Sequence, residues 1–294
     1  MSTAEYGLHN LSGLNFNLIK KSLKKKSVTN DSYCKEFEKK VSKYTGSRYC
    51  MACNNGTSAL LISILAIKNK NPIIIIPNIN FISAANIVYL LGGKIILCDV
   101  NEKSGMIDEK TFQEVIKNCK IKNVKPDIFM PIHYAGKVLD LRKISKICKK
   151  EKIKIIEDGC HSFGSSNKKN KVGDSKLSEF TTFSFHPVKN ITTIEGGAIT
   201  TNSFKNFKKL IELKTFSLIK TNINDPYQLK TPSLNFRMGE INAAIGLNQM
   251  KKIKKFKSVR QNLVNYYIEK FKNLDEILTI ENKKDKRIFW HLLV

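Results

Sequence analysis

The sequence predicts an α/β protein whose mostly parallel sheet is covered by helices. Strand-like apolar runs alternate with stretches of helical spacing along much of the chain. Parallel strands need crossover connections of about a dozen residues, and helices provide them. Polar and small residues follow directly after several strand-like runs, which is where ligands bind in such sheets. A chain of 294 residues with 41% apolar residues is long enough to bury a large core.

The elements are expected in a regular order. Helices are identified by apolar residues three or four positions apart, as with Phe37 and Val41, and strands by short apolar runs. Asp108 is a candidate N-cap of the helix that it precedes. The first helices are expected at 14–23 and 33–44. The strands and helices that then alternate are expected at 49–53, 59–67, 73–77, 82–91, 94–100, 108–119, 127–133, 139–151 and 153–158.

One lysine is presented between two expected strands. Residues 182–185 alternate polar and apolar side chains, and Pro187 ends that strand. Lys189 follows, and a Glu-Gly-Gly sequence leads into a second strand at 198–201. A lysine held in such a loop can be partly desolvated, which lowers its pKa and makes its amine a nucleophile towards carbonyl groups. The alternative is an ordinary surface lysine.

The pattern changes after residue 203. The closing residues 288–294 are apolar and indicate a strand, although chain ends are usually polar. Helices are expected at 204–215, 238–256 and 259–271, an irregular link at 217–231, and a charged turn at 281–286.

The net charge of +26 comes almost entirely from lysine. Only five of the 51 basic residues are Arg, which leaves 51 − 5 = 46 Lys. Nucleic-acid interfaces usually use Arg, so nucleic-acid binding is an alternative that depends on charge alone. We expect solvated helix faces that attract anionic, phosphate-bearing ligands. The apolar runs are too short to span a bilayer, so no membrane partner is expected.

Cysteine usage indicates a reducing compartment. The chain has seven cysteines, an odd number, with no disulfide-scaffold pattern. No N-terminal secretory signal is seen, and a cytoplasmic location is therefore expected. Cys50 and Cys53 stand without a second pair, so two core or near-surface thiols are favoured over a zinc or redox site, and no metal is expected.

A phosphate site is expected where Gly56, Thr57 and Ser58 open a helix. Free backbone N–H groups and the helix dipole attract anions there, and the two hydroxyls can add hydrogen bonds. A plain N-cap by Thr57 or Ser58 is the alternative. Ser184, five residues before Lys189, is a candidate ligand of the same phosphate.

Three further residues follow strands and suit a flat, charged ring. Asp158 ends an apolar strand, where burying a carboxylate without a cation or donor costs free energy. Asp158 could therefore bind a protonated ring nitrogen, cap a helix or pair with a lysine. Phe81 could stack on a ring or belong to the core. His161 could reach a phenolic oxygen or be structural. With Lys189 and the phosphate site, this set matches what pyridoxal 5′-phosphate requires of a protein.

The chain resembles the DegT/DnrJ/EryC1/StrS family of pyridoxal-phosphate-dependent sugar aminotransferases. The Ser-Phe-His-Pro-Val-Lys-Asn-Ile-Thr-Thr sequence around Lys189 is highly specific, and the resemblance is closest to members that aminate 4-keto nucleotide sugars. The segments that carry the resemblance occur in family order and cover nearly the whole chain. They are residues 55–60, 77–86, 156–164, 183–197 and 235–244.

The resemblance implies the type I, aspartate-aminotransferase-like fold and a homodimer with shared sites. Lys189 matches the lysine that binds the cofactor covalently, and Asp158 matches the partner of the pyridine nitrogen. These two are the implied catalytic residues. The remaining cofactor-binding positions are Thr57, Ser58 and Ser184 at the phosphate, Phe81 on the ring face, His161 near the ring oxygen O3′, and Asn235, which a second subunit contributes to the phosphate.

The implied reaction moves an amino group from an amino-acid donor, glutamate, to a nucleotide-linked keto sugar in surface-polysaccharide or amino-sugar biosynthesis. Residues 1–255 are expected to form the large cofactor-binding domain. Residues 256–294 are expected to begin a C-terminal small domain that is incomplete, as in a truncated reading frame, because the family's remaining strands and helix are absent.

Two departures from the family pattern and two alternatives accompany this prediction. Ile194 stands where a Gly often precedes Glu-Gly-Gly, and Asn30-Asp31 where many members have Gly-Pro. A truncated, inactive remnant that only binds a partner is the alternative from another class of protein. A sugar dehydratase of the same family is the alternative enzyme, but such members carry His at the position of Lys189.

Overall fold

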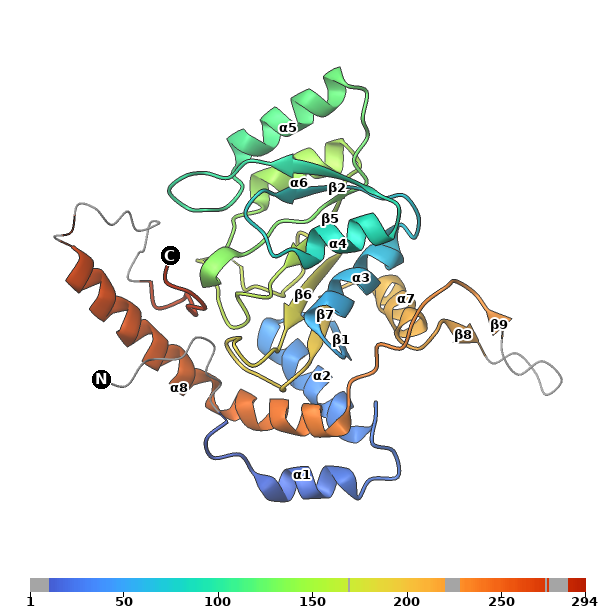
Figure 1. Ribbon diagram of the computed structural model, residues 1–294, viewed down its shortest axis with the longest axis vertical. Coiled ribbons are helices and arrows are strands. Elements are labelled where there is room, and N and C mark those ends of the chain that lie inside the picture. The colour runs from blue at the N-terminus through green and yellow to red at the C-terminus, as the bar shows by residue number, and fades with distance from the viewer. Residues whose placement is uncertain (1–10, 169, 220–227, 273, 275–284) are drawn as a thin grey trace.

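The computed structural model describes residues 11–294 except 169, 220–227, 273 and 275–284. Its centre is a seven-stranded sheet with the order β1-β7-β6-β5-β4-β2-β3 (Figure 1). Strand β7 pairs antiparallel with both β1 and β6, so β1 and β6 point the same way, and the other neighbours are parallel. The predicted mostly parallel sheet is confirmed. The strands are β1 (Tyr49–Cys53), β2 (Ile73–Pro77), β3 (Lys94–Cys98), β4 (Ile128–Phe129), β5 (Lys154–Asp158), β6 (Phe180–Ser184) and β7 (Gly197–Thr201).

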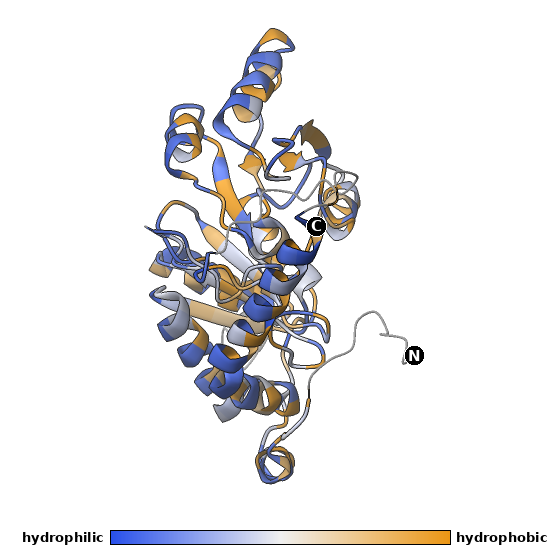
Figure 2. Ribbon diagram, turned by 90° about the vertical axis from the view of Figure 1, so that its left-hand side faces the viewer, coloured by the Kyte–Doolittle hydropathy of each residue, from blue (hydrophilic) through white to orange (hydrophobic). Residues whose placement is uncertain are grey.

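Helices cover both faces of the sheet. One face packs against α3, α4 and α7, and the other packs against α5 and α6 at one end and α2 and α8 at the other. Apolar strands lie at the centre and hydrophilic helix surfaces face outward (Figure 2). The helices are α1 (Phe16–Leu23), α2 (Ser32–Thr45), α3 (Gly56–Ile67), α4 (Ser83–Leu90), α5 (Glu109–Ile121), α6 (Arg142–Lys150), α7 (Phe204–Lys214) and α8 (Glu240–Phe271), with a 3₁₀ turn at Tyr134–Gly136.

Apart from the edge strand β3, whose Leu97 is exposed, the strands are largely buried on both faces, and their side chains alternate between the two faces. In β2, Ile74 and Ile76 join the core under α3, whereas Ile75 joins the core under α5. In β1, Cys53 lies on the α3 side and Cys50 on the α2 side. The two thiols therefore face opposite sides of the sheet, which is incompatible with a shared metal ion or a disulfide between them.

The structure differs from the expected elements in three places. The structure has a single helix, α8, where two helices were expected at 238–256 and 259–271. The residues between them, Lys257 and Ser258, are neither Pro nor Gly and so do not break the helix. Residues 288–294 form no strand; their backbone bonds to loops and side chains instead, such as His291 N–H to the Ala135 carbonyl at 3.0 Å. The strand expected at 127–133 is only two residues long, since Pro131 cannot donate to a neighbour.

The link expected at 217–231 contains a short antiparallel pair, β8 (Leu218–Ile219) and β9 (Gln228–Leu229). Residues 281–284 of the expected charged turn lie outside the described residues. The proposed domain boundary at 255/256 falls inside α8 and stays a prediction. Within the described ranges, the helices are too short or too polar to cross a bilayer.

Candidate active site

The predicted site residues gather at the carboxyl edge of the sheet. Six of the seven strands run in the same direction, so the loops after β1, β2, β5 and β6 leave from one edge. Strand β7 begins at this edge: its Gly197 is the register partner of both Cys53 at the end of β1 and Ser184 at the end of β6. The topology therefore brings together loops that are far apart in sequence.

A close backbone contact joins the start of α3 to the end of β6. A Cβ atom on Gly56 would lie 2.6 Å from the Ser184 Cβ and 3.1 Å from its Oγ, and one on Gly197 would lie 2.3 Å from the Asn55 carbonyl oxygen. Only glycine permits these approaches. The Ser184 hydroxyl is thus held beside the first turn of a helix, where backbone N–H groups and the helix dipole favour an anion.

The capping of α3 differs from the expected alternative. Asn55, not Thr57 or Ser58, is the N-cap: its Oδ1 accepts from the Ser58 backbone N–H at 2.7 Å. Thr57 is exposed and Ser58 is buried. The hydroxyl of Thr57 is therefore available to a ligand at this edge.

Asp158 is held rigidly at the end of β5. Its side chain is buried, and Oδ1 accepts from the backbone N–H of Cys160 at 3.0 Å. Its own N–H donates to the Pro131 carbonyl at 2.8 Å, and its carbonyl accepts from His133 N–H at 3.0 Å. A buried carboxylate needs a cation or hydrogen-bond donors, and these bonds fix where such a partner would sit.

Lys189 projects from the tight turn that follows β6. Its side chain is half-buried, and its backbone N–H donates to the His186 carbonyl at 2.9 Å. The next residue, Asn190, is buried and donates from Nδ2 to the carbonyls of Phe163 at 3.2 Å and Phe289 at 3.0 Å. The lysine is therefore carried by a turn that is anchored to two other loops.

Two imidazoles lie close to Lys189. The ring centroids of His161 and His291 are 4.5 Å apart. Burial, followed by the positive charge of Lys189, lowers the pKa of His161 to about 4, although Asp158 acts in the opposite direction. Burial and the charges of His161, Lys189 and Arg260 lower the pKa of His291 to about 2. Both rings are therefore neutral at pH 7, and each Nδ1 atom is buried without a hydrogen-bond partner among the described residues.

His291 was missed by the sequence analysis, which treated it as part of a terminal strand. It lies between Trp290 and Leu292, and these apolar neighbours in the sequence give no sign of a functional residue. The structure brings it to the site because residues 285–294 pack between α8 and the loops of the site (Figure 1). Arg260 on α8 fixes this segment by donating from Nη1 to the carbonyls of Trp290 at 3.1 Å and His291 at 3.3 Å.

Phe81 and Asn235 lie at the surface. Phe81 follows β2 and is 66% exposed, with its N–H bonded to the Asn80 Oδ1. Asn235 is exposed, and its Oδ1 accepts from the Arg237 N–H at 3.2 Å. The adjacent Phe236 carbonyl accepts from Asn54 N–H, which keeps this segment beside the end of β1. The roles expected for both residues stay predictions.

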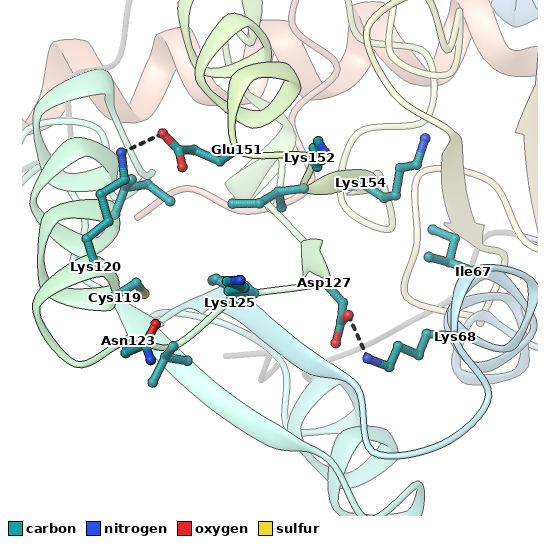
Figure 3. Close-up of a pocket in the computed structure, with 14 residues that line it drawn as sticks. Ile67, Lys68, Cys119, Lys120, Asn123, Lys125, Asp127, Glu151, Lys152 and Lys154 are labelled. Carbon is teal, nitrogen blue, oxygen red and sulfur yellow. Dashed lines mark hydrogen bonds and ion pairs between the residues drawn. The ribbon is translucent and has the colours of Figure 1, made fainter.

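A separate cavity lies at the opposite, amino edge of the sheet (Figure 3). It measures about 490 Å³, and none of the predicted site residues lines it. Its two carboxylates are already paired, Asp127 with Lys68 and Glu151 with Lys120, each at 2.7 Å. The chemistry expected from the sequence therefore belongs to the carboxyl edge.

The chain is similar to known proteins in sequence and in fold. The DegT/DnrJ/EryC1/StrS aminotransferase family matches residues 11–294. A UDP-4-amino-4,6-dideoxy-N-acetyl-beta-L-altrosamine transaminase of Campylobacter jejuni is 29% identical over 288 residues, which are 98% of this chain and 74% of that protein. A dTDP-4-amino-4,6-dideoxy-D-glucose transaminase of Shigella dysenteriae is 32% identical over 254 residues, covering 86% of this chain and 65% of that protein.

Solved structures share the fold. Helicobacter pylori PseC, an aminotransferase involved in the biosynthesis of pseudoaminic acid, matches with a TM-score of 0.86 and 25% identity over 99% of this chain and 77% of that chain. The PLP-form of a sugar aminotransferase from Streptococcus pneumoniae matches with the same TM-score of 0.86 at 21% identity, covering 99% and 77%. These likenesses agree with the expected type I fold.

Proposed function

Because the chain belongs to the DegT/DnrJ/EryC1/StrS aminotransferase family, we propose that it transfers an amino group from glutamate to the keto group of a nucleotide-linked sugar. The main support for this proposal is that one edge of the sheet brings several residues close to the start of α3. These residues are Lys189, Asp158, His161 and Ser184. Related proteins named as transaminases of UDP- and dTDP-linked amino sugars support this choice of substrate class. Such products serve polysaccharide and amino-sugar biosynthesis.

Members of this family depend on pyridoxal 5′-phosphate, and the residues present fit that group. Gly56 and Gly197 let the start of α3 approach the end of β6 so closely that the Ser184 hydroxyl lies beside the first turn of the helix, which suits a phosphate. The unpartnered Nδ1 of His161 and the fixed carboxylate of Asp158 offer polar partners for a ring. Lys189 lies close enough to influence the pKa of His161, so all three belong to one cluster.

Each residue has a distinct role in this proposal. When bound, the cofactor supplies an electron sink for the carbanion that forms next to the amino group of the substrate. Lys189 binds it covalently between turnovers and, once released, moves a proton to or from the substrate carbon through Nζ. Asp158 keeps the ring nitrogen protonated, and the start of α3 with Thr57, Ser58 and Ser184 holds the phosphate. His161 remains neutral and orients the ring oxygen, and Phe81 covers the ring face.

The site is completed by a second copy of the chain in this proposal. Asn235 is exposed. Among the described residues, it forms no hydrogen bond to another predicted site residue of its own chain. A residue with those properties can serve the phosphate of a partner. The proposed homodimer places two such shared sites in one molecule.

We also propose a cytoplasmic location. All seven cysteines are free thiols, six of them buried. Free thiols in this number suit a reducing compartment.

A half-reaction assay tests the proposed function. Protein loaded with pyridoxal phosphate should lose its visible absorption on addition of glutamate and release 2-oxoglutarate. Addition of a 4-keto UDP-, dTDP- or GDP-sugar should restore the absorption and yield an aminated sugar detectable by mass. Release of 2-oxoglutarate without amination of any keto sugar would contradict the proposed acceptor. Failure to retain the cofactor would contradict the enzyme assignment itself.

A further inference from the structure

A second cavity, of about 550 Å³, opens directly beside the Lys189 turn. Its walls come from three parts of the chain: the turn itself, one face of α8 and the segment before α1. The size lies within the range of about 300–1,000 Å³ that is usual for small-molecule sites. The residues that matter to its chemistry are Lys189, Lys252, Lys255, Phe256, Val259 and Arg260.

The walls of this cavity carry only positive charge. Four cationic side chains line it and no carboxylate does, and none of the four forms an ion pair within the described parts of the chain. Two of them hold the walls together. Lys252 donates from Nζ to the carbonyls of Ser12 at 2.6 Å and Gly13 at 2.8 Å. Arg260, through its bonds to Trp290 and His291, fixes the segment that carries His291.

Lysine and arginine without counter-ions in one concave site favour an anionic ligand. Phe256 and Val259 add an apolar wall on the same face of α8, which suits the carbon skeleton of a larger molecule. Glutamate is too small to use a volume of this size, whereas a nucleoside diphosphate linked to a sugar contains both the charge and the bulk. Lys189 also lines the cavity, so a ligand here reaches the lysine that does the chemistry.

We propose that this cavity binds the diphosphate of the nucleotide-linked sugar and so directs its keto carbon towards Lys189. The proposal depends on the proposed function, because it assigns a place to the acceptor of that reaction. Lys255 is the exposed cation that contacts the diphosphate, and Lys252 and Arg260 shape the walls and add to the potential.

Charge reversal at one position tests this assignment. In Lys255→Glu, the Kd for UDP, measured by titration calorimetry on the cofactor-loaded protein, should rise about tenfold or more, since loss of one charge-assisted contact is worth at least that factor. The matched control is Lys254→Glu. Lys254 is an exposed neighbour on the same helix that does not line the cavity, and its replacement changes the net charge equally. This control should change the Kd by less than about threefold.

Steady-state kinetics distinguishes the two possible sources of the anion. In Lys255→Glu, the KM for the keto sugar should rise far more than the KM for glutamate. A larger rise for glutamate would mean that the cavity holds the donor's carboxylates, and would overturn the proposal. Equal effects of Lys254→Glu and Lys255→Glu, or no binding of UDP, dTDP or GDP by the wild type, would overturn it as well. Wild-type protein that binds UDP through Lys255 but aminates no sugar would refute the proposed function and leave this site standing.

Discussion

At the scale of single residues, the site combines one cation with two neutral rings. Lys189 and the imidazoles of His161 and His291 are all partly buried and lie near one another, and the carboxylate of Asp158 lies near His161. Proton uptake by either imidazole would place a second positive charge next to Lys189, so burial and Coulomb repulsion both favour the neutral rings. A neutral imidazole can accept or donate a hydrogen bond, which is what an oxygen on a bound ring requires.

These lowered pKa values predict how stability depends on pH. An unfolded histidine binds a proton near pH 6.5, whereas native His161 does so only near 4 and native His291 near 2. Between pH 6.5 and 4 the unfolded chain therefore binds more protons, and the free energy of unfolding should fall as the pH drops. His291→Asn should make this fall shallower. Urea unfolding at pH 7 and pH 5 measures it, and an unchanged difference between the two pH values in the variant would contradict the result.

The backbone at Ile194 has a conformation that is unusual for a branched residue. Ile194 occupies the position at which family members often have Gly, and its φ of 69° lies in the left-handed region that glycine adopts freely. Its N–H donates to the Thr192 Oγ1 at 2.9 Å, which holds the turn despite the branched side chain. The backbone at Ile194 therefore has a conformation suited to glycine although the residue is branched.

At the scale of elements, Glu240 joins the starts of two helices. It is the first residue of α8 and is fully buried. Its carboxylate accepts the backbone N–H groups of Asp31 at 2.7 Å, Tyr33 at 2.8 Å and Cys34 at 3.1 Å, all at the start of α2. Burial alone would raise the pKa of Glu240, but the bonds from Cys34 and from these N–H groups outweigh it and lower the pKa. An anion at a helix N-terminus is stabilising, and here it comes from a distant helix.

Removal of this carboxylate should destabilise the protein. In Glu240→Ala, one buried and two half-buried N–H groups lose their acceptor, and we expect a loss of about 2–4 kcal/mol in the free energy of unfolding at pH 7. Glu240→Gln, which keeps one acceptor oxygen, should lose less. Denaturant unfolding monitored by circular dichroism provides the comparison. If the two variants were equally stable, the role given to the carboxylate would be wrong.

The elements that the sequence predicted well are those with strong local signals. The strand at Ile73–Pro77 has a continuous apolar run, and Asp108 caps α5 through a reciprocal capping box with Thr111, as its position suggests. Local pattern did not predict that α8 is continuous, nor that residues 288–294 pair with no strand. Whether an apolar run forms a strand depends on a neighbour that only the folded chain provides.

The same distinction applies to the site. Motifs around Asp158, Ser184 and Lys189 could be read from the sequence, because each ends or follows a strand at the edge where ligands bind. Asn55 as the N-cap of α3 and His291 beside His161 could not, since both depend on how distant segments pack. The role of Phe81 in particular remains a prediction, because its ring is exposed in this chain.

At the scale of the whole molecule, the proposed homodimer makes each site depend on two chains. We expect sedimentation to show a dimer. In an equal mixture of Lys189→Ala and Asn235→Asp proteins that were unfolded and refolded together, half of the dimers are mixed. Each mixed dimer then has one intact site, so about a quarter of wild-type activity should return. Each variant alone should have little activity. If the mixture stayed as inactive as its components, Asn235 would not serve the partner's site.

The central claim is that one of 46 lysines, Lys189, binds the cofactor. The most direct measurement is to load the protein with pyridoxal phosphate, reduce it with borohydride and locate the added mass by peptide sequencing in a mass spectrometer. We predict a single modified peptide that contains Lys189, and no stoichiometric label in Lys189→Ala. A label spread over surface lysines, or an equally strong label in the Lys189→Ala protein, would contradict the account.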